Sequence, residues 1–164
     1  MALEFLHSKN ILYRDLKSDN ISIEVDQTNG NSSIITKLTD FSLAVKIDPD
    51  SAGLRGFAGT PEYMAPEVVR QPGNRALTPQ KITPFISLKA DVFSVGVLAY
   101  EVLTGSTAFG FASKTCMSLY SAILHQEPQF KERAFRKCSP DCIDFIKQCL
   151  QKKADLRPSV SDLL

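Results

Sequence analysis

The sequence predicts a mainly α-helical fold with one small antiparallel β-hairpin, and three observations carry this prediction. Residues 88–104 are apolar on nearly all sides, as expected for a helix in the middle of a domain. Two β-branched runs, 21–25 and 34–39, flank the dipeptide Asn29-Gly30, which is a strong hairpin-turn signal. Capping signals further along the chain predict additional helices.

Residues 1–7 are expected to form a helix whose apolar side includes Leu3 and Leu6. No capping residue precedes this segment, and about two turns of helix are too short to be stable alone. We therefore expect the chain to begin inside a longer helix, so that Met1 is an internal methionine or the sequence is a fragment.

Gly105 is placed to end the central helix, because glycine readily adopts the left-handed conformation found after helices. Three shorter helices are expected beyond it, over 113–125, 139–151 and 159–164. Ser139 is the expected cap of the second, with Pro140 in its first turn. Ser159 and Asp162 form a Ser-x-x-Asp box at the start of the third.

Size and composition are those of an ordinary soluble globular domain. The chain has 164 residues, of which 43% are hydrophobic and 23% are charged. Its net charge of +1 gives no basic field for nucleic acid. The longest apolar stretch, 92–103, is too short and too interrupted to span a membrane, and no signal peptide precedes it. We expect a soluble cytoplasmic protein without a nucleic-acid or membrane partner.

The four cysteines predict neither a zinc site nor a disulfide framework. They are Cys116, Cys138, Cys142 and Cys149, with no C-x-x-C pair and no neighbouring histidine to complete a zinc set. The last three fall on one helix face, so the preferred interpretation is buried thiols on a core-facing helix. Unpaired thiols favour a reducing intracellular compartment.

Three motifs carry the chemistry. They are Tyr13-Arg14-Asp15-Leu16-Lys17-Ser18-Asp19-Asn20, then Asp40-Phe41-Ser42, then Gly59-Thr60-Pro61-Glu62-Tyr63-Met64-Ala65-Pro66-Glu67. Asp15 is placed to accept a hydroxyl proton, a kind of help worth roughly 10²–10⁴-fold in rate. Lys17 can set a positive charge beside a phosphate. Asn20 and Asp40 offer oxygen ligands, which the hard ion Mg²⁺ prefers.

Each of these residues alone has a structural explanation. A single Asp-x-Lys is usually a surface pair, and an asparagine before a strand is usually a turn residue. Asp40 alone could cap a helix or lie in a loop. Because the motifs occur together in one order, phosphoryl transfer from ATP becomes the favoured interpretation over an unrelated helical protein.

Together the motifs resemble the C-terminal lobe of a eukaryotic-type protein kinase of the serine/threonine branch, from about residue 3 to residue 164. The resemblance implies one domain over 1–164, a partial kinase fold, with ATP, Mg²⁺ and a protein substrate as ligands. The N-terminal lobe is not recognised: we find no glycine-rich loop, strand lysine or partner-glutamate helix. We therefore expect the parent chain to supply it, and the chain alone to transfer phosphate poorly.

The resemblance implies that Thr60 bridges Asp15 and Lys17 and marks serine/threonine specificity. Arg14 is implied to meet a phosphate on the activation segment, residues 40–67. Gly56 occupies the frequent phosphorylation position, and Ser51 is the sole hydroxyl residue between Ser42 and Thr60. Phospho-Ser51, a nearby acid, or nothing at all could therefore meet Arg14.

Other residues are implied to support the structure. Glu67 and Arg157 are expected to form a buried ion pair, whose disruption typically costs about 3–5 kcal/mol. Asp91 is expected to bind the backbone of the catalytic loop. Residues 71 to about 86 are rich in proline and polar side chains, which indicates a loop. We interpret this loop as an insertion, and we favour a solvent-exposed loop over a docking site.

Ser42 and the unrecognised N-terminal lobe keep an alternative open. Tyr13 also departs from the family pattern, where histidine is commoner, but several kinase families share this change, so it carries little weight. Ser42 replaces the glycine after Asp40-Phe41, which narrows the backbone choices of that turn. The alternative is therefore a pseudokinase or regulatory fragment that uses the lobe as a scaffold, although a scaffold has no need for all four of Asp15, Lys17, Asn20 and Asp40.

Overall fold

The computed structural model describes residues 2–26, 33–48, 50–51, 53–73, 85–112, 114–130 and 133–164. Its helices are α1 (Ala2–Ser8), α2 (Pro66–Val69), α3 (Lys89–Thr104), α4 (Cys116–His125) and α5 (Pro140–Cys149). Its strands are β1 (Ile11–Leu12), β2 (Ile21–Asp26), β3 (Ser33–Leu38) and β4 (Val45–Lys46). The predicted fold class, mainly helical with a small antiparallel hairpin, is confirmed.

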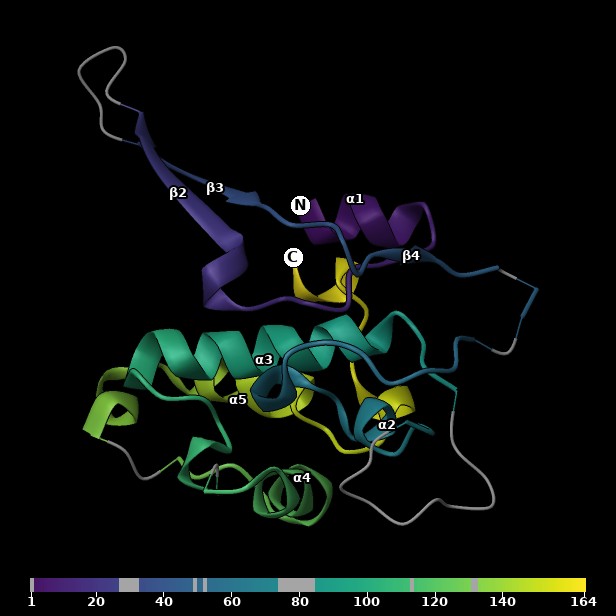
Figure 1. Ribbon diagram of the computed structural model, residues 1–164. Helices are drawn as coiled ribbons and strands as arrows, with labels where there is room; N and C mark the ends of the chain where they lie inside the picture. Colours follow the sequence, from purple (N-terminus) through teal and green to yellow (C-terminus); the bar gives the residue numbers. More distant parts are fainter. Residues whose placement is uncertain are drawn as a thin grey trace.

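Helix α3 runs through the middle of the domain, with α5 against it and α4 on the side away from α1 (Figure 1). Phe93 and Val97 are fully buried in the main hydrophobic core. Gly96 allows α5 to approach, since a Cβ atom there would lie 2.7 Å from Cβ of Cys149. Gly105 ends the helix as predicted, with a left-handed φ of 76°.

A second hydrophobic cluster joins α1 to α3. Leu3 and Leu6 of α1 are buried with Tyr13, Leu16 and Val92. Burial of these apolar groups compensates for the short length of α1, which could not be stable alone. The same cluster holds the segment after β1, where the first motif lies, against the middle of the domain.

Strand β1 pairs with β4 in an antiparallel two-stranded sheet that the sequence analysis did not anticipate. Ile11 lies opposite Lys46 and Leu12 opposite Val45. Two-residue strands carry no measurable periodicity, so only the folded chain shows this pairing. It brings together the segments that precede and follow the hairpin.

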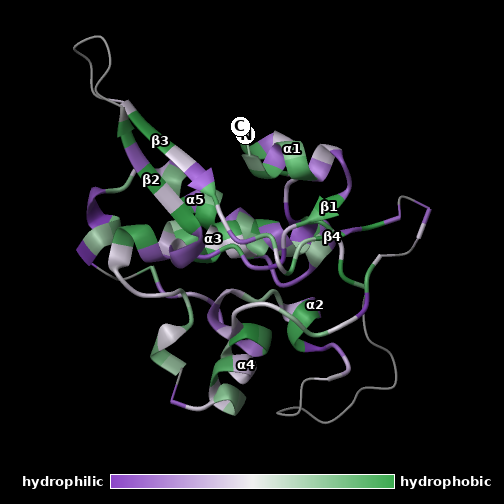
Figure 2. Cartoon of the chain, turned by 45° about the horizontal axis from the view of Figure 1, so that its top comes forward, coloured by the Kyte–Doolittle hydropathy of each residue, from purple (hydrophilic) through white to green (hydrophobic). Residues whose placement is uncertain are grey.

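The hairpin pairs β2 with β3 over six residue pairs, from Ile21 opposite Leu38 to Asp26 opposite Ser33. It stands out from the helical body, and hydrophobic stretches remain visible along both strands (Figure 2). Ile23, Val25 and Ile34 are each more than half exposed. The predicted Asn29-Gly30 turn lies outside the described residues.

The later helices match the prediction in part. Helix α4 begins at Cys116, because the Thr115 side chain accepts the Ser118 amide as its cap. Helix α5 has the predicted Ser139 cap. The helix predicted over 159–164 is wrong: that region holds a 3₁₀ turn, Ser161–Leu163. Its Ser159–Asp162 box is present, but a single turn is costly to nucleate as α-helix.

The interpretation of Cys138, Cys142 and Cys149 as one buried face is correct for Cys149 only. Cys138 and Cys142 are partly buried, and Cys138 precedes α5 instead of lying on it. Burial raises the pKa of the Cys149 thiol to about 12. Within the predicted loop, residues 74–84 lie outside the described part of the chain. Among the described helices none is both long and apolar enough to cross a membrane.

Candidate active site

Residues 13–20, which the resemblance predicts to be the catalytic loop, run from β1 to β2 and are anchored by one buried carboxylate. Asp91, in the first turn of α3, accepts the backbone amides of Tyr13 and Arg14 at 2.8 Å and 2.9 Å. Its Oδ2 also lies 2.9 Å from Nε2 of His7 in α1. Arg14 has a positive φ of 73°, a strained backbone conformation that these contacts stabilise.

The Asp15 carboxylate lies where three polar side chains converge. Thr60 donates its hydroxyl to Oδ1 at 2.6 Å, and Asn20 donates Nδ2 to Oδ2 at 3.0 Å. Lys17 Nζ lies 3.1 Å from Oδ2 and donates to the Thr60 hydroxyl at 3.0 Å. A second bond from Asn20 to the Asp15 carbonyl closes the loop at 2.9 Å.

These contacts set the ionisation of Asp15. Burial on its own would raise the pKa of the carboxyl group, but hydrogen bonds from Thr60, Lys17 and Asn20 and the charge of Lys17 lower it. The net pKa lies below the usual 3.8. Asp15 is therefore an ionised acceptor at neutral pH, held in one orientation.

The hairpin brings Asp40 to the same end of the structure as Asn20. The Thr39 amide donates to the Asn20 carbonyl at 2.9 Å, which extends the β2–β3 register by one step. Asp40 follows directly, with a positive φ of 51° and an exposed carboxylate. Its Oδ1 accepts the Ser42 amide at 3.1 Å. Hydrogen bonding to Ser42 lowers the pKa of Asp40, and the charge of Lys17 adds to this effect.

Tyr13 connects the two motifs, a role that the sequence analysis missed. Its hydroxyl donates to the Thr39 carbonyl, and its ring meets Phe41 edge-on with centroids 5.4 Å apart. Burial raises the pKa of Tyr13, and the nearby charges of Asp15 and Asp40 raise it further. Tyr13 thus joins the loop that holds Asp15 to the segment that holds Asp40. His7 was also missed, since no local pattern points to its contact with Asp91.

The predicted partners Glu67 and Arg157 lie together away from this loop. The Arg157 guanidinium binds the Glu67 carboxylate with two hydrogen bonds, of 2.7 Å and 2.8 Å, and both side chains are buried. It also donates to the carbonyls of Lys89 and Gln151. Because one cation joins α2, the start of α3 and the C-terminal segment, its role is structural.

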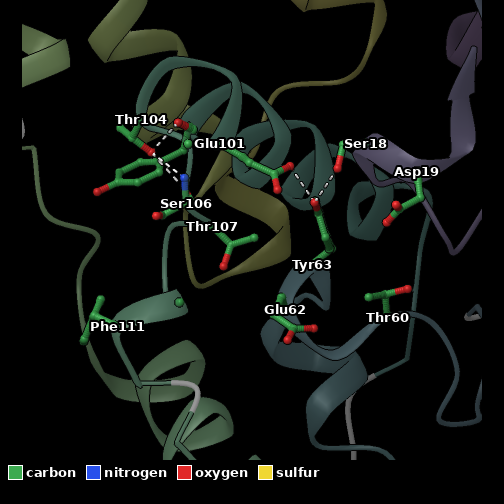
Figure 3. A pocket seen from close by; sticks show the side chains of 13 residues that line it. Ser18, Asp19, Thr60, Glu62, Tyr63, Glu101, Thr104, Ser106, Thr107 and Phe111 are labelled. Carbon is green, nitrogen blue, oxygen red and sulfur yellow. Dashed lines mark hydrogen bonds between the residues drawn. The ribbon is translucent and has the colours of Figure 1, made fainter.

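An open groove of about 780 Å³ begins beside the catalytic loop. Thr60 lines its near end, and Tyr63 stands in its wall (Figure 3). The Tyr63 hydroxyl donates to Glu101 Oε2 at 2.5 Å and lies 3.3 Å from Ser18 Oγ. Asp15 does not itself line the groove, but Thr60 lines it and donates a hydrogen bond to Asp15.

The donor set at Asn20 and Asp40 fits Mg²⁺. Both hydrogen bonds described for the Asn20 side chain use Nδ2, which leaves its amide oxygen as a ligand. Asp40 adds an exposed carboxylate. No cluster of three or more metal-binding side chains occurs among the described residues. Asn20 and Asp40 could hold a magnesium ion together with phosphate and water, which usually complete its coordination.

Comparison with known proteins identifies the family. A profile of the protein kinase domain matches residues 1–164. The chain is 32% identical over 163 residues to serine/threonine-protein kinase PAK 1 of Mus musculus, covering 99% of this chain and 26% of that protein. It is also 32% identical over 163 residues to serine/threonine-protein kinase 17A of Oryctolagus cuniculus, covering 99% and 36%.

A third relative, CDPK-related kinase 7 of Arabidopsis thaliana, is 32% identical over 151 residues, or 92% of this chain and 23% of that protein. The chain thus spans between 23% and 36% of the length of these relatives. On the match of the whole chain, it belongs to the protein kinase domain family.

Proposed function

We propose that this domain, completed by an ATP-covering lobe in its parent protein, transfers the γ-phosphate of ATP to serine or threonine hydroxyls of protein substrates. The observation that carries the proposal is the set of bonds around Asp15. Thr60 and Asn20 each donate to its carboxylate, and Lys17 lies 3.1 Å away. A charge arranged in this way can accept a proton from a hydroxyl held above it.

Each polar group has a distinct task in this proposal. Asp15 orients the substrate hydroxyl and accepts its proton, since the lowered pKa keeps the carboxylate ionised before transfer. Lys17 holds a fixed positive charge beside the transferred phosphate. Thr60 holds Lys17 and Asp15 in position relative to each other. Its hydroxyl accepts a hydrogen bond from Lys17 and donates one to Asp15.

Asn20 and Asp40 would hold Mg²⁺ in the nucleotide complex. A bound Mg²⁺ would supply positive charge that neutralises the phosphates of ATP. Asn20 directly precedes β2 and Asp40 follows β3, and the Thr39–Asn20 backbone bond keeps these two ends together. Because Asn20 also contacts Asp15, a metal bound to Asn20 would lie near the proposed proton acceptor.

The groove beside Thr60 is the proposed place for the protein substrate. It opens next to Asp15, so a chain lying in it can present a hydroxyl to that carboxylate.

The four cysteines form no disulfide in the structure, which supports a cytoplasmic setting. The alternative of an inactive scaffold draws support from Ser42, whose amide already occupies one oxygen of Asp40.

The test is ATP-dependent labelling of serine peptides by the complete parent protein. We expect Asp15→Asn to lower the rate constant by roughly 10²–10⁴-fold. Asp144→Asn, which changes an aspartate on α5 away from the site, is the matched control and should leave the rate unchanged. Undiminished transfer by Asp15→Asn, or absence of transfer by the wild-type parent protein, would contradict the proposal and favour the scaffold.

A further inference from the structure

The segment that leads into Thr60 contains no side-chain hydroxyl from Gly53 to Gly59. Ser51 precedes it, but its hydroxyl donates to the Asp48 carbonyl at 2.7 Å within a local turn. A phosphate on residues 53–59 is therefore impossible through serine, threonine or tyrosine. Something else must hold this segment, because Thr60 positions both Lys17 and Asp15.

A backbone bridge holds the segment at Leu54. The Leu54 and Ile86 backbones exchange two hydrogen bonds of 2.8 Å, one in each direction. Ile86 is only 1% exposed, and Leu54 packs against the same hydrophobic core. An isolated bridge whose side chains pack against a hydrophobic core resists opening more than an exposed one, since opening it exposes apolar surface.

Two neighbouring residues reinforce this bridge. The Arg55 guanidinium lies over the Phe85 ring, 4.4 Å from the ring centroid. Gly53 adopts a φ of 117°, and a Cβ atom there would lie 2.6 Å from the Ile86 carbonyl oxygen. Glycine is thus needed at this position for the two backbones to approach.

Further contacts continue along the segment to the catalytic loop. The Gly56 amide donates to the Gln71 side chain at 3.2 Å, and Phe57 meets Tyr120 edge-on. At Gly59 the backbone lies so close to the loop that a Cβ atom would be 2.6 Å from the Arg14 carbonyl oxygen. Contacts therefore hold the segment at several points between Gly53 and Gly59.

We propose that Phe85 and Ile86 form a latch that positions Thr60, and through it Asp15, in place of a phosphate on the activation segment. Phe85 and Ile86 are positioning residues, because neither contacts Asp15 directly. The catalytic consequence of the latch rests on the proposed function, whereas its structural part does not. Asp91 binds the backbone amide of Arg14, so the catalytic loop is anchored at Arg14 without a phosphate.

The structural part is tested by amide hydrogen exchange at Leu54 and Ile86 in this chain. We expect Phe85→Ala to speed exchange about two- to fivefold, the range that corresponds to an exposed cation–π contact. Phe85→Tyr keeps an aromatic face and should restore the slow rate. Phe5→Ala is the matched control, because Phe5 is also an exposed ring near a cation, Lys9, on a different element.

Gly53→Ala should speed exchange more than Phe85→Ala does, because it blocks the bridge itself. Unchanged exchange at Leu54 and Ile86 in both variants would overturn the latch. An equal change in Phe5→Ala would also overturn it, since the effect would then be general loosening.

The catalytic part is tested in the complete parent protein. We expect Phe85→Ala to lower kcat about two- to fivefold with an unchanged KM for ATP, and Phe85→Tyr to rescue it. Ser51→Ala and phosphatase treatment should leave kcat unchanged. Loss of activity in either would show that a phosphate holds the segment. If the wild-type parent protein transfers nothing, the proposed function fails, while hydrogen exchange still decides the latch.

Discussion

The catalytic loop and the β2–β3 hairpin follow each other in sequence but are held in opposite ways. Two backbone amides of the loop bind the buried carboxylate of Asp91, some 78 residues away for Tyr13. The hairpin depends mainly on its own register, and Ile23, Val25 and Ile34 remain largely exposed. Long-range contacts thus hold the loop, and local pairing holds the hairpin.

The same contrast separates the two acids of the proposed site. Asp15 has three side-chain partners and is mostly buried, whereas Asp40 is exposed and bonded to the amide of Ser42. The proposed proton acceptor is therefore pre-organised within this chain. The proposed metal-binding acid keeps a free face toward solvent, as a ligand for an incoming ion must. Pre-organisation where charge develops is a main source of catalytic rate.

The largest expected effect falls on the buried ion pair of Glu67 and Arg157. We expect Arg157→Met to lower the free energy of unfolding by about 3–5 kcal/mol, because Glu67 would be left buried without its partner. Urea denaturation measures this loss, with the exposed Lys153→Met as control. A loss below about 1 kcal/mol would mean that Glu67 finds water or another partner.

Asp91→Ala should come next, at about 2–4 kcal/mol. It would leave the amides of Tyr13 and Arg14 without an acceptor in the interior, and each unsatisfied group is costly. Denaturation against Asp141→Ala, an exposed acid in the first turn of α5, measures the difference. If the two variants unfold alike, the loop is not anchored at Asp91 and the contrast with the hairpin disappears.

A pH titration sharpens the contrast at Asp15. Its pKa in the folded chain lies below 3.8, so its ionised form stabilises the fold above that pH. This contribution is lost as the pH falls through the folded pKa. We expect the unfolding free energy of Asp15→Asn to depend less steeply on pH between about 5 and 2 than that of the wild type. Identical slopes would show that Thr60, Lys17 and Asn20 do not stabilise the carboxylate.

The smallest effect is expected on the hairpin. The Lys37–Glu24 pair joins opposite strands at 2.7 Å, but both side chains are more than half exposed. We expect Lys37→Met to change the unfolding free energy by no more than about 1 kcal/mol. Thermal unfolding in low and high salt measures it. A larger loss of unfolding free energy that depends on salt would show that this ion pair stabilises the hairpin strongly.

Sequence patterns predicted what local chemistry determines. The apolar run of α3 and the two runs of the hairpin predicted the fold class. Gly105 correctly predicted the end of α3, and Ser139 correctly predicted the start of α5. The motif order also pointed to Asp15, Lys17, Asn20 and Thr60, which the structure brings into contact. Their catalytic roles stay predictions, as does the metal role of Asp40.

Contacts between segments that are far apart in the sequence could not be predicted from these local patterns. The β1–β4 pair and the Leu54–Ile86 bridge each join short extended pieces that have no periodicity of their own. Tyr13 was given little weight as a replacement, although its hydroxyl and ring join the two motifs. The final helix failed because a capping box is a local signal, whereas α-helix formation also needs length and packing.

We propose that Asp15 accepts the proton and that Asp40 binds the metal. The Mg²⁺ dependence of phosphate transfer in the complete parent protein tests these two roles most directly. We expect Asp40→Asn to raise the Mg²⁺ concentration needed for half-maximal rate. Asp15→Asn should lower the maximal rate and leave that concentration unchanged. Equal Mg²⁺ requirements for wild type and Asp40→Asn, or a shifted requirement in Asp15→Asn, would contradict the assignment of Asp40 to the metal and Asp15 to the proton.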